Sequence, residues 1–307
     1  MPTRDHPLEV LALLRAARET GLLEVLLTET ASPAAAAAAA DVDERAARIT
    51  VDTLADRGYL ARVEGGYEPT NRALGLLTKT DLRSVGATPH AIDLFDALAT
   101  LPETMRTGTP PAGDDEQARN ELGARLTTDE AMVRAVVTAA LRAAADATDV
   151  LVLAGAPGVV ADEFAARGCS VTLVDETEAV AATRPLVSEA VECVTAPMTE
   201  LPPERFDLTV AVDYAHKLTT AENRHLASAA RGLLSTGGHL VVVDRLRGRS
   251  AGATALDVEA LATTVGGRAY DEADYRSWFD GAGFVGVDVA AVPGTDRQVV
   301  AGRRPRD

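Results

Sequence analysis

Apolar residues recur three and four positions apart through most of the first hundred residues. This spacing places them on one face of a helix and predicts that the amino-terminal third is mostly helical. The residues that set the pattern are Leu8, Leu11, Leu14, Leu22, Leu23, Leu26 and Leu27. Ser32-Pro33 predicts the start of a further helix, because Ser caps a helix amino terminus and Pro suits the first turn. Asp43 is expected to cap the next helix, which Gly58 ends.

A hairpin pattern follows this helix. Residues 59–63 and 67–69 carry strand-forming side chains, and Gly65-Gly66 between them favours a tight turn. The order helix, turn, helix, hairpin is typical of a winged helix. Winged helices often bind DNA, but residues 1–106 hold 11 Lys and Arg against 16 Asp and Glu. That negative balance favours a protein-interaction role over binding in a DNA groove.

From residue 149 onward, strands alternate with helices. Five apolar runs predict strands and two further segments predict a closing hairpin, at 150–154, 171–174, 191–194, 207–212, 239–243, 285–290 and 298–301. Such alternation forms a parallel, doubly wound sheet, and the hairpin makes the last strand antiparallel. The Pro-, Gly- and acid-rich segment 107–117 predicts the domain boundary. We expect an α/β protein, with an α-rich winged-helix domain over 1–106 and a Rossmann-like domain over 107–307.

Composition argues against several classes of protein. The 307 residues carry a formal net charge of −16, which opposes binding to nucleic acid. The amino terminus has no apolar core of signal-peptide length, and no apolar run reaches the length of a membrane span. The two cysteines form no metal-binding or redox motif. We expect a cytoplasmic protein with no membrane, metal or nucleic-acid partner.

Lysine is nearly absent from the chain. It occurs only at Lys79 and Lys217, and every other cationic side chain is arginine. An acidic, Lys-poor chain rich in Ala and Val resembles the proteins of extremely halophilic microbes, in which surface carboxylates keep the protein hydrated in molar salt. The alternative is a GC-rich genome that favours Ala, Arg, Asp and Val codons.

The first strand after residue 149 ends in a candidate cofactor loop, Ala154-Gly155-Ala156-Pro157-Gly158, and Asp175 ends the next strand. A glycine turn lets a ligand approach a helix amino terminus, and an acid at the second strand can bind ribose hydroxyls. The dinucleotide fingerprint needs glycine at 155, 157 and 160, but the last two positions hold Pro157 and Val160. The pattern therefore favours S-adenosylmethionine (SAM) over NAD, with an ordinary strand–helix turn as the alternative.

Segments in a definite order carry a family resemblance from about Leu11 to Arg303. They are TGLLEVL, RGYLARVEGGYEPTN, LPETMRTG, VLVLAGAPG, AVDYAHKLTTAENRHLASAARGLLSTGGHLVVVD and VGGRAYDEADYRSWFDGAGF. The chain resembles the SAM-dependent O-methyltransferases that pair a winged-helix dimerisation domain with a class I methyltransferase domain. Plant small-molecule O-methyltransferases and acetylserotonin methyltransferase belong to this group.

The resemblance implies roles for individual residues. His216 falls where the family has its catalytic base, which removes the proton from a substrate hydroxyl as the oxygen attacks the methyl group of SAM. An imidazole suits this step because its pKa lies near neutrality. The resemblance assigns the cofactor to Ala154, Gly155, Ala156 and Gly158 in the loop, to Asp175 at the ribose, to Met198 at the adenine, and to Asp213.

The chain also departs from the family pattern. An acid or glycine that is usual in the family is replaced at Val152, Ala154, Ala156, Pro197, Lys217 and Ala269, the last aligning with a carboxylate that orients the histidine. These replacements keep open a second interpretation, a weak or inactive methyltransferase-like protein that binds a ligand. A third, a winged-helix transcription regulator with a metabolite-sensing domain, is disfavoured by the acidic charge of the winged-helix region. We predict a homodimeric enzyme that methylates a hydroxyl of a small molecule with His216 as the general base.

We predict that the protein partly unfolds or dissociates in dilute buffer. The Debye length grows from ~3 Å in 1 M salt to ~30 Å in 0.01 M salt, so the excess carboxylates repel one another over a longer distance. Thermal melting between dilute and molar KCl measures the effect. A melting temperature that does not depend on KCl contradicts the halophilic interpretation.

Overall fold

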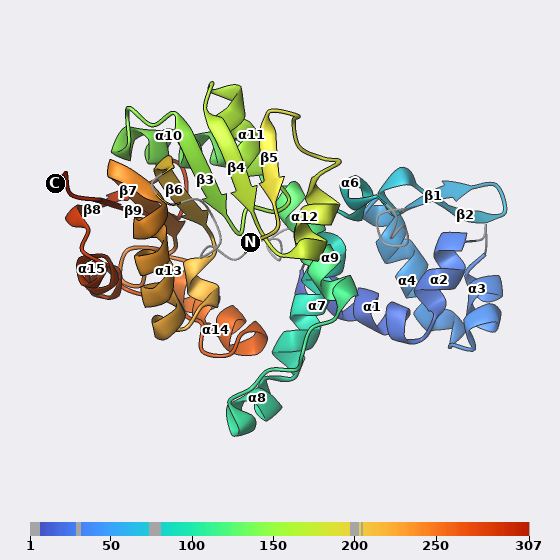
Figure 1. Cartoon of the computed structure of the whole chain (residues 1–307). Coiled ribbons are helices and arrows are strands. Elements are labelled where there is room, and N and C mark those ends of the chain that lie inside the picture. The colour runs from blue at the N-terminus through green and yellow to red at the C-terminus, as the bar shows by residue number, and fades with distance from the viewer. Residues whose placement is uncertain (1–6, 29–31, 74–80, 197–202, 204, 307) are drawn as a thin grey trace. The chain divides into compact units, whose positions relative to one another are not determined.

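Figure 1 shows a computed structural model of the chain, which describes residues 7–28, 32–73, 81–196, 203 and 205–306. The chain forms two compact units. The first comprises Met1–Ala99 and Gly113–Thr127, and the second comprises Thr100–Ala112 and Thr128–Asp307. None of the described helices combines the length and the apolar character that crossing a membrane requires.

The first unit is helical apart from one hairpin. Its elements are α1 (Leu8–Glu19), α2 (Leu22–Thr28), α3 (Pro33–Ala40), α4 (Glu44–Asp56), β1 (Leu60–Val63), β2 (Gly66–Pro69), α6 (Leu82–Val85), α7 (Thr88–Ala99) and α9 (Asp115–Leu126). The side chains of Ser32 and Asp43 cap α3 and α4 as the sequence predicts, each accepting a hydrogen bond from a backbone N–H of the first turn. The leucines of α1 and α2 that set the helical pattern are buried in this unit's own core, except Leu8, which is 66% exposed.

The segment between the two units differs in detail from the sequence expectation. Helix α8 (Leu101–Thr107) belongs to the second unit, and α9 begins at Asp115, inside the stretch predicted as a break. Asp114 and Gln117 start α9 early because they form a capping box, in which each side chain bonds the other residue's backbone N–H. The acidic residues of this stretch thus begin a helix that packs in the first unit.

The second unit contains the seven-stranded sheet that the sequence predicts. Its strands are β3 (Asp149–Leu153), β4 (Ser170–Val174), β5 (Val191–Val194), β6 (Phe206–Val212), β7 (Leu234–Asp244), β8 (Val285–Ala291) and β9 (Gln298–Arg303). They lie in the order β5-β4-β3-β6-β7-β9-β8. The first five run parallel, and β9 is antiparallel to both of its neighbours. The expected α/β class and antiparallel last strand are confirmed (Figure 1).

Helices cover both faces of this sheet. The described helices here are α10 (Glu130–Ala143), α11 (Val159–Ala166), α12 (Thr177–Thr183), α13 (Thr220–Leu233), α14 (Ala253–Thr263) and α15 (Glu272–Gly281). Alternate residues of β3 enter different cores: Leu151 and Leu153 pack with α13 and α15, whereas Val150 and Val152 pack with α10 and α11. This alternation explains why the strands read as continuous apolar runs, since both faces of a parallel sheet are buried.

The loop between β3 and α11 is shaped by contacts within the chain. A Cβ on Gly158 would lie 2.0 Å from Val187 Cγ1, and the backbone there has a φ of +94°. A Cβ on Gly155 would lie 2.8 Å from Val152 Cγ1. Both glycines are therefore required by the packing of the chain itself, which makes them weaker evidence for a ligand than the sequence pattern implied.

We expect Gly158→Ala to destabilise the second unit more than Gly168→Ala. Both residues have positive φ, which costs an alanine about 1–2 kcal/mol, but a Cβ on Gly168 meets nothing within 4 Å. The clash at Gly158 adds about 1–3 kcal/mol of overpacking. Urea unfolding of both variants measures the difference, and equal losses of stability would show that Val187 moves aside at little cost.

Candidate active site

The predicted site residues gather at the carboxyl ends of β3, β4 and β6, where parallel strands place their following loops at one edge of the sheet. The structure brings the cofactor loop and Asp175 together. The backbone N–H of Ala156 donates to Asp175 Oδ2 at 2.9 Å, and the N–H of Glu176 donates to Asp175 Oδ1 at 2.9 Å. Asp175 therefore fixes the loop from the neighbouring strand.

The hydrogen-bond acceptors at this loop match what the hydroxyl groups of a ribose would need. The side chain of Asp175 is partly exposed, and a carboxylate offers about four lone-pair directions, of which the two backbone N–H groups occupy two. Residues 155–158 are buried, and Ala154, with a φ of +47°, is half-buried. Met198 and Pro197, predicted beside the adenine, lie outside the described residues. Asp175 thus keeps the acceptor capacity that a ribose would need, and the cofactor roles of Asp175 and Met198 stay predictions.

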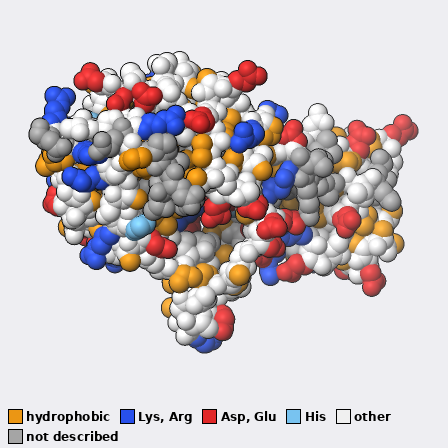
Figure 2. All heavy atoms as spheres, in the orientation of Figure 1, with side chains coloured by type: hydrophobic (Ala, Val, Ile, Leu, Met, Phe, Trp, Pro, Cys, Tyr) orange, Lys and Arg blue, Asp and Glu red, His pale blue; other side chains and the backbone are white. Residues whose placement is uncertain are grey.

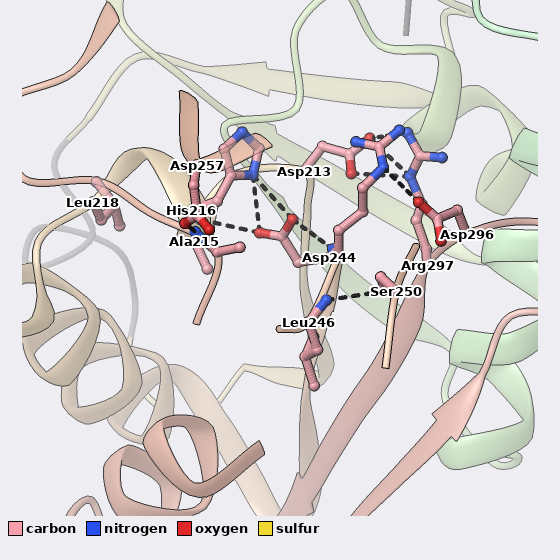
Figure 3. Close-up of polar contacts among 12 residues, drawn as sticks. Asp213, Ala215, His216, Leu218, Asp244, Leu246, Ser250, Asp257, Asp296 and Arg297 are labelled. Carbon is pink, nitrogen blue, oxygen red and sulfur yellow. Dashed lines mark hydrogen bonds and ion pairs between the residues drawn. The ribbon is translucent and has the colours of Figure 1, made fainter. Parts of the chain in front are cut away.

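His216 is held against a buried carboxylate. It lies in the 3₁₀ turn Ala215–Lys217, and its ring Nδ1 is 2.9 Å and 3.0 Å from the two carboxylate oxygens of Asp244, the last residue of β7. The backbone N–H of His216 also donates to Asp244 Oδ2 at 3.0 Å. Figure 3 shows the ring with Nδ1 turned to Asp244 and its other nitrogen pointing away. Because an ionised carboxylate only accepts, Nδ1 carries a hydrogen and Nε2 is the atom that can take a proton.

The environment makes His216 a stronger base than an ordinary histidine. Burial lowers the pKa of its imidazole, but the charge of Asp244 and the hydrogen bond to it raise that pKa more, so the net shift is upward. Asp213 adds to the rise, and Lys217 opposes it. Lys217, which stands where the family has an acid, therefore favours the neutral ring, but it does not outweigh Asp244.

Asp244 is the functional residue that the sequence reasoning missed. The expected partner of His216 aligned with Ala269, which has no carboxylate and is 1% exposed. Asp244 supplies a carboxylate to His216 instead and is fully buried. The sequence signal for Asp244 was an acid directly after the apolar run 239–243. Neighbouring parallel strands end side by side, so the residues that follow β6 and β7 meet. The N–H of Asp213, after β6, donates to the carbonyl of Val243 at 2.9 Å.

Two further side chains fix the turn that carries His216. The amide of Asn223, on α13, donates to the carbonyl of Ala215 at 2.9 Å. The hydroxyl of Tyr270 donates to the carbonyl of Leu218 at 2.6 Å. Helix α13 itself starts with a capping box between Thr219 and Glu222, which begins the helix directly after the turn. The imidazole is thus supported by rigid elements, as a catalytic group requires.

Asp213, predicted to bind the cofactor, is already engaged by a cation. Its backbone has a φ of +50°, and its carboxylate accepts from Arg297 Nε at 2.9 Å and from Arg297 Nη2 at 2.6 Å. Burial raises the pKa of Asp213, but the Arg297 guanidinium outweighs it and holds that pKa below its usual value. The cofactor role of Asp213 stays a prediction. Within the described residues, no group of three or more His, Cys, Asp and Glu side chains is arranged to hold a metal ion.

Comparison with solved structures finds matches along nearly the whole chain. Human N-acetylserotonin methyltransferase, solved with SAM, is 18% identical with a TM-score of 0.69, and the match covers 97% of this chain and 94% of that one. A riboflavin-analogue dimethyltransferase from Streptomyces davawensis, named N,N-8-amino-8-demethyl-D-riboflavin dimethyltransferase, is 19% identical with a TM-score of 0.73 and coverages of 97% and 96%. Mitomycin 7-O-methyltransferase is 17% identical with a TM-score of 0.71 and coverages of 96% and 94%.

No protein-family model matches the chain, and no curated protein sequence does. At identities below 20%, the structural likeness establishes the fold and leaves the chemistry to the residues of the site. From its amino-terminal helices to its antiparallel last strand, the chain has the fold of these methyltransferases.

Proposed function

We propose that the protein transfers a methyl group from SAM to a hydroxyl group of a small molecule, with His216 as the general base. The observation that carries the proposal is the His216–Asp244 pair at the carboxyl edge of the sheet, close in the fold to the loop that Asp175 fixes. Structural neighbours solved with SAM or with S-adenosylhomocysteine support the choice of cofactor.

The described residues would hold the cofactor on its ribose side. The remaining acceptor positions of Asp175 would receive the ribose hydroxyls, and the Ala154–Gly158 backbone would line the neighbouring surface. When bound, SAM supplies an activated methyl group on a positively charged sulfur. Position accounts for much of the rate of such a direct transfer, because the reacting atoms are held in line.

His216 and Asp244 would manage the proton of the acceptor. Nε2 of His216 would take the proton of the acceptor hydroxyl, and the imidazolium that results would be stabilised by the buried Asp244 carboxylate. A hydroxyl needs such a base, whereas a neutral amine attacks through its own lone pair. For this reason His216 favours an oxygen acceptor, although one structural neighbour is named as an N,N-dimethyltransferase.

A second candidate is a non-catalytic ligand-binding protein on the same scaffold. The observation that favours it is the packing of the cofactor loop, where Val187 lies against Gly158 and residues 155–158 are buried. In this view the loop is an ordinary strand–helix turn. Binding of SAM to the purified protein separates the two candidates before any substrate is known.

We also propose that the first unit is a winged-helix dimerisation domain and that the protein is a homodimer in the cytoplasm. The succession of α3, α4, β1 and β2 has the order of a winged helix. The leucines that set the helical pattern of α1 and α2 give little support for a dimer interface, because all but Leu8 are buried within the unit. A second candidate surface, which lies in the second unit, is an apolar stripe of Val258 and Leu261 on α14 and Val265 just after it, 43%, 43% and 63% exposed; Figure 2 shows hydrophobic side chains over α14.

Paired variants separate the chemistry from the binding of the cofactor. His216→Ala should lower methyl transfer by roughly 10²–10⁴-fold, the usual contribution of a positioned base, and leave SAM affinity nearly unchanged. Asp175→Ala should weaken SAM binding by ~1–3 kcal/mol. Asp175→Asn is the matched control, because its amide oxygen can still accept from the N–H of Ala156. Calorimetry with SAM and methyl transfer to a panel of phenols and catechols in high salt measure both.

The pH dependence of the rate tests whether His216 acts as the base. Since the base must be neutral and its pKa is raised, the rate should fall as pH drops through that raised pKa. Asp244→Asn removes the charge that raises it and should move the acid limb to lower pH. Equal rates for wild type and His216→Ala would exclude His216 as the base. Failure of the wild type to bind SAM even at millimolar concentration would favour the non-catalytic candidate.

The homodimer has its own measurement. We expect light scattering in high salt to give twice the chain mass at micromolar concentration. Leu261→Asp should shift the population toward monomer, because it places a charge in the middle of the apolar stripe. Val285→Asp, at a residue 42% exposed on β8, serves as the control. A monomer mass for the wild type contradicts the proposal, and a dimer in both variants places the interface elsewhere.

A further inference from the structure

A second ion pair lies beside the His216–Asp244 pair; its arginine, Arg297, is buried and its carboxylate, Asp213, is partly exposed. Arg297, the residue before β9, is 7% exposed. Its Nε donates to both carboxylate oxygens of Asp213, at 2.9 Å and 3.0 Å, and its Nη2 donates to Oδ2 at 2.6 Å. This two-pronged geometry is the strong form of an arginine–carboxylate contact. Figure 3 shows the pair on the opposite side of Asp244 from His216.

The position of Asp213 makes this pair relevant to the base. Asp213 lies three residues before His216, and its backbone N–H donates to the carbonyl of Val243, the residue before Asp244. Two carboxylates therefore end adjacent strands next to one imidazole. Without a partner, Asp213 would place a second uncompensated negative charge near the imidazole, where it would favour the protonated ring. The Arg297 guanidinium supplies the opposite charge from a separate element, the β8–β9 hairpin.

The contact also fixes a backbone that would otherwise be unfavourable. Asp213 has a φ of +50°, a left-handed conformation that is uncommon for residues other than glycine. Such a conformation persists when the surrounding structure over-determines it. Here the two anchors are the hydrogen bond to Val243 and the fork of Arg297. The chain leaves β6 through Asp213 directly into the turn that carries His216, so the same anchors set the course of that turn.

Other charged groups face His216 from the elements packed around it. Asp244 follows from β7, Lys217 lies on the same turn, and Glu259 faces it from α14. Burial raises the pKa of Glu259, and Arg245 and His216 oppose that rise. Arg245 is itself paired with Asp296 at 3.4 Å. A substitution at Asp213 or Arg297 therefore changes one charge and leaves these other charged groups in place.

We propose that Asp213 and Arg297 are positioning residues for His216, in which Arg297 neutralises Asp213 so that Asp244 is the dominant carboxylate acting on the imidazole. The proposal rests on the proposed function in taking His216 as the base, but it concerns a property of the histidine that can be measured without a substrate. It predicts that removing Arg297 and removing Asp213 shift the titration midpoint of His216 in opposite directions. Removing the cation exposes the charge of Asp213, and removing the anion leaves the cation unopposed.

The test is an NMR titration of the His216 ring protons in the full chain. The chain has five histidines, and the His216→Gln variant identifies the signal. Relative to wild type, Arg297→Gln should raise the titration midpoint and Asp213→Asn should lower it, each by about one pH unit, the lower end of the effect of a neighbouring charge. The double variant should titrate near the wild-type midpoint, because both charges are gone.

Two further variants separate this effect from a general loss of structure. Arg297→Lys keeps the charge without the fork, so its midpoint should stay near that of the wild type even if its melting temperature falls. Arg249→Gln removes a guanidinium from a partly exposed ion pair with Glu272 and should leave the midpoint unchanged. Shifts of the same sign in Arg297→Gln and Asp213→Asn, or no shift in Asp213→Asn, would overturn the proposal.

The outcomes distinguish this proposal from the proposed function. If methyl transfer is measurable, the acid limb of its kcat/KM profile should move with the NMR midpoint in each variant. If the midpoints shift as expected but the protein transfers no methyl group, the positioning role of Asp213 and Arg297 is supported and the proposed enzymatic function is not. Methyl transfer with midpoints that do not move would support the enzyme and refute the role of Arg297.

Discussion

A fully buried carboxylate at the end of β7 is the constraint on which the described site depends. An ionised carboxylate in a protein interior is costly unless hydrogen bonds and a charge compensate it. Asp244 meets this requirement with the backbone N–H groups of His216 and Arg245 and with the imidazole of His216. The turn after β6 is therefore tied to the strand beside it, and the orientation of His216 follows from the need to satisfy Asp244.

The same rule extends along the sheet edge, where two buried arginines are each paired with a partly exposed carboxylate. Asp213 is matched by Arg297 and Arg245 by Asp296, each pair joining segments distant in the sequence. Breaking one member of such a pair is more costly than its net contribution to stability, because the other charge stays buried and unpaired. The site thus combines one ionisable histidine with charges that are largely compensated by a partner.

The glycines of the cofactor loop have two possible explanations, binding of a ligand and packing within the chain. Gly155 and Gly158 resemble residues selected for the close approach of a ligand, yet side chains of the chain itself already fill the space next to them. Asp175 gives stronger support for a ribose site, because it fixes the loop and still has acceptor positions to offer. A polar group with spare hydrogen-bonding capacity therefore points to a ligand more directly than a glycine that packing requires.

The sequence by itself determined the order of the strands along the chain, the parallel sheet with its antiparallel last strand, and the place of His216 after β6, because hydrophobic period, caps and turns act over a few residues. It did not predict α12 or α14. It could not determine which carboxylate meets His216, since Asp244 is 28 positions away and only strand pairing aligns the two. Nor could it reveal Arg297, which is 84 positions from Asp213. Those contacts were decided by the tertiary structure, because a buried charge selects its partner in space and not along the chain.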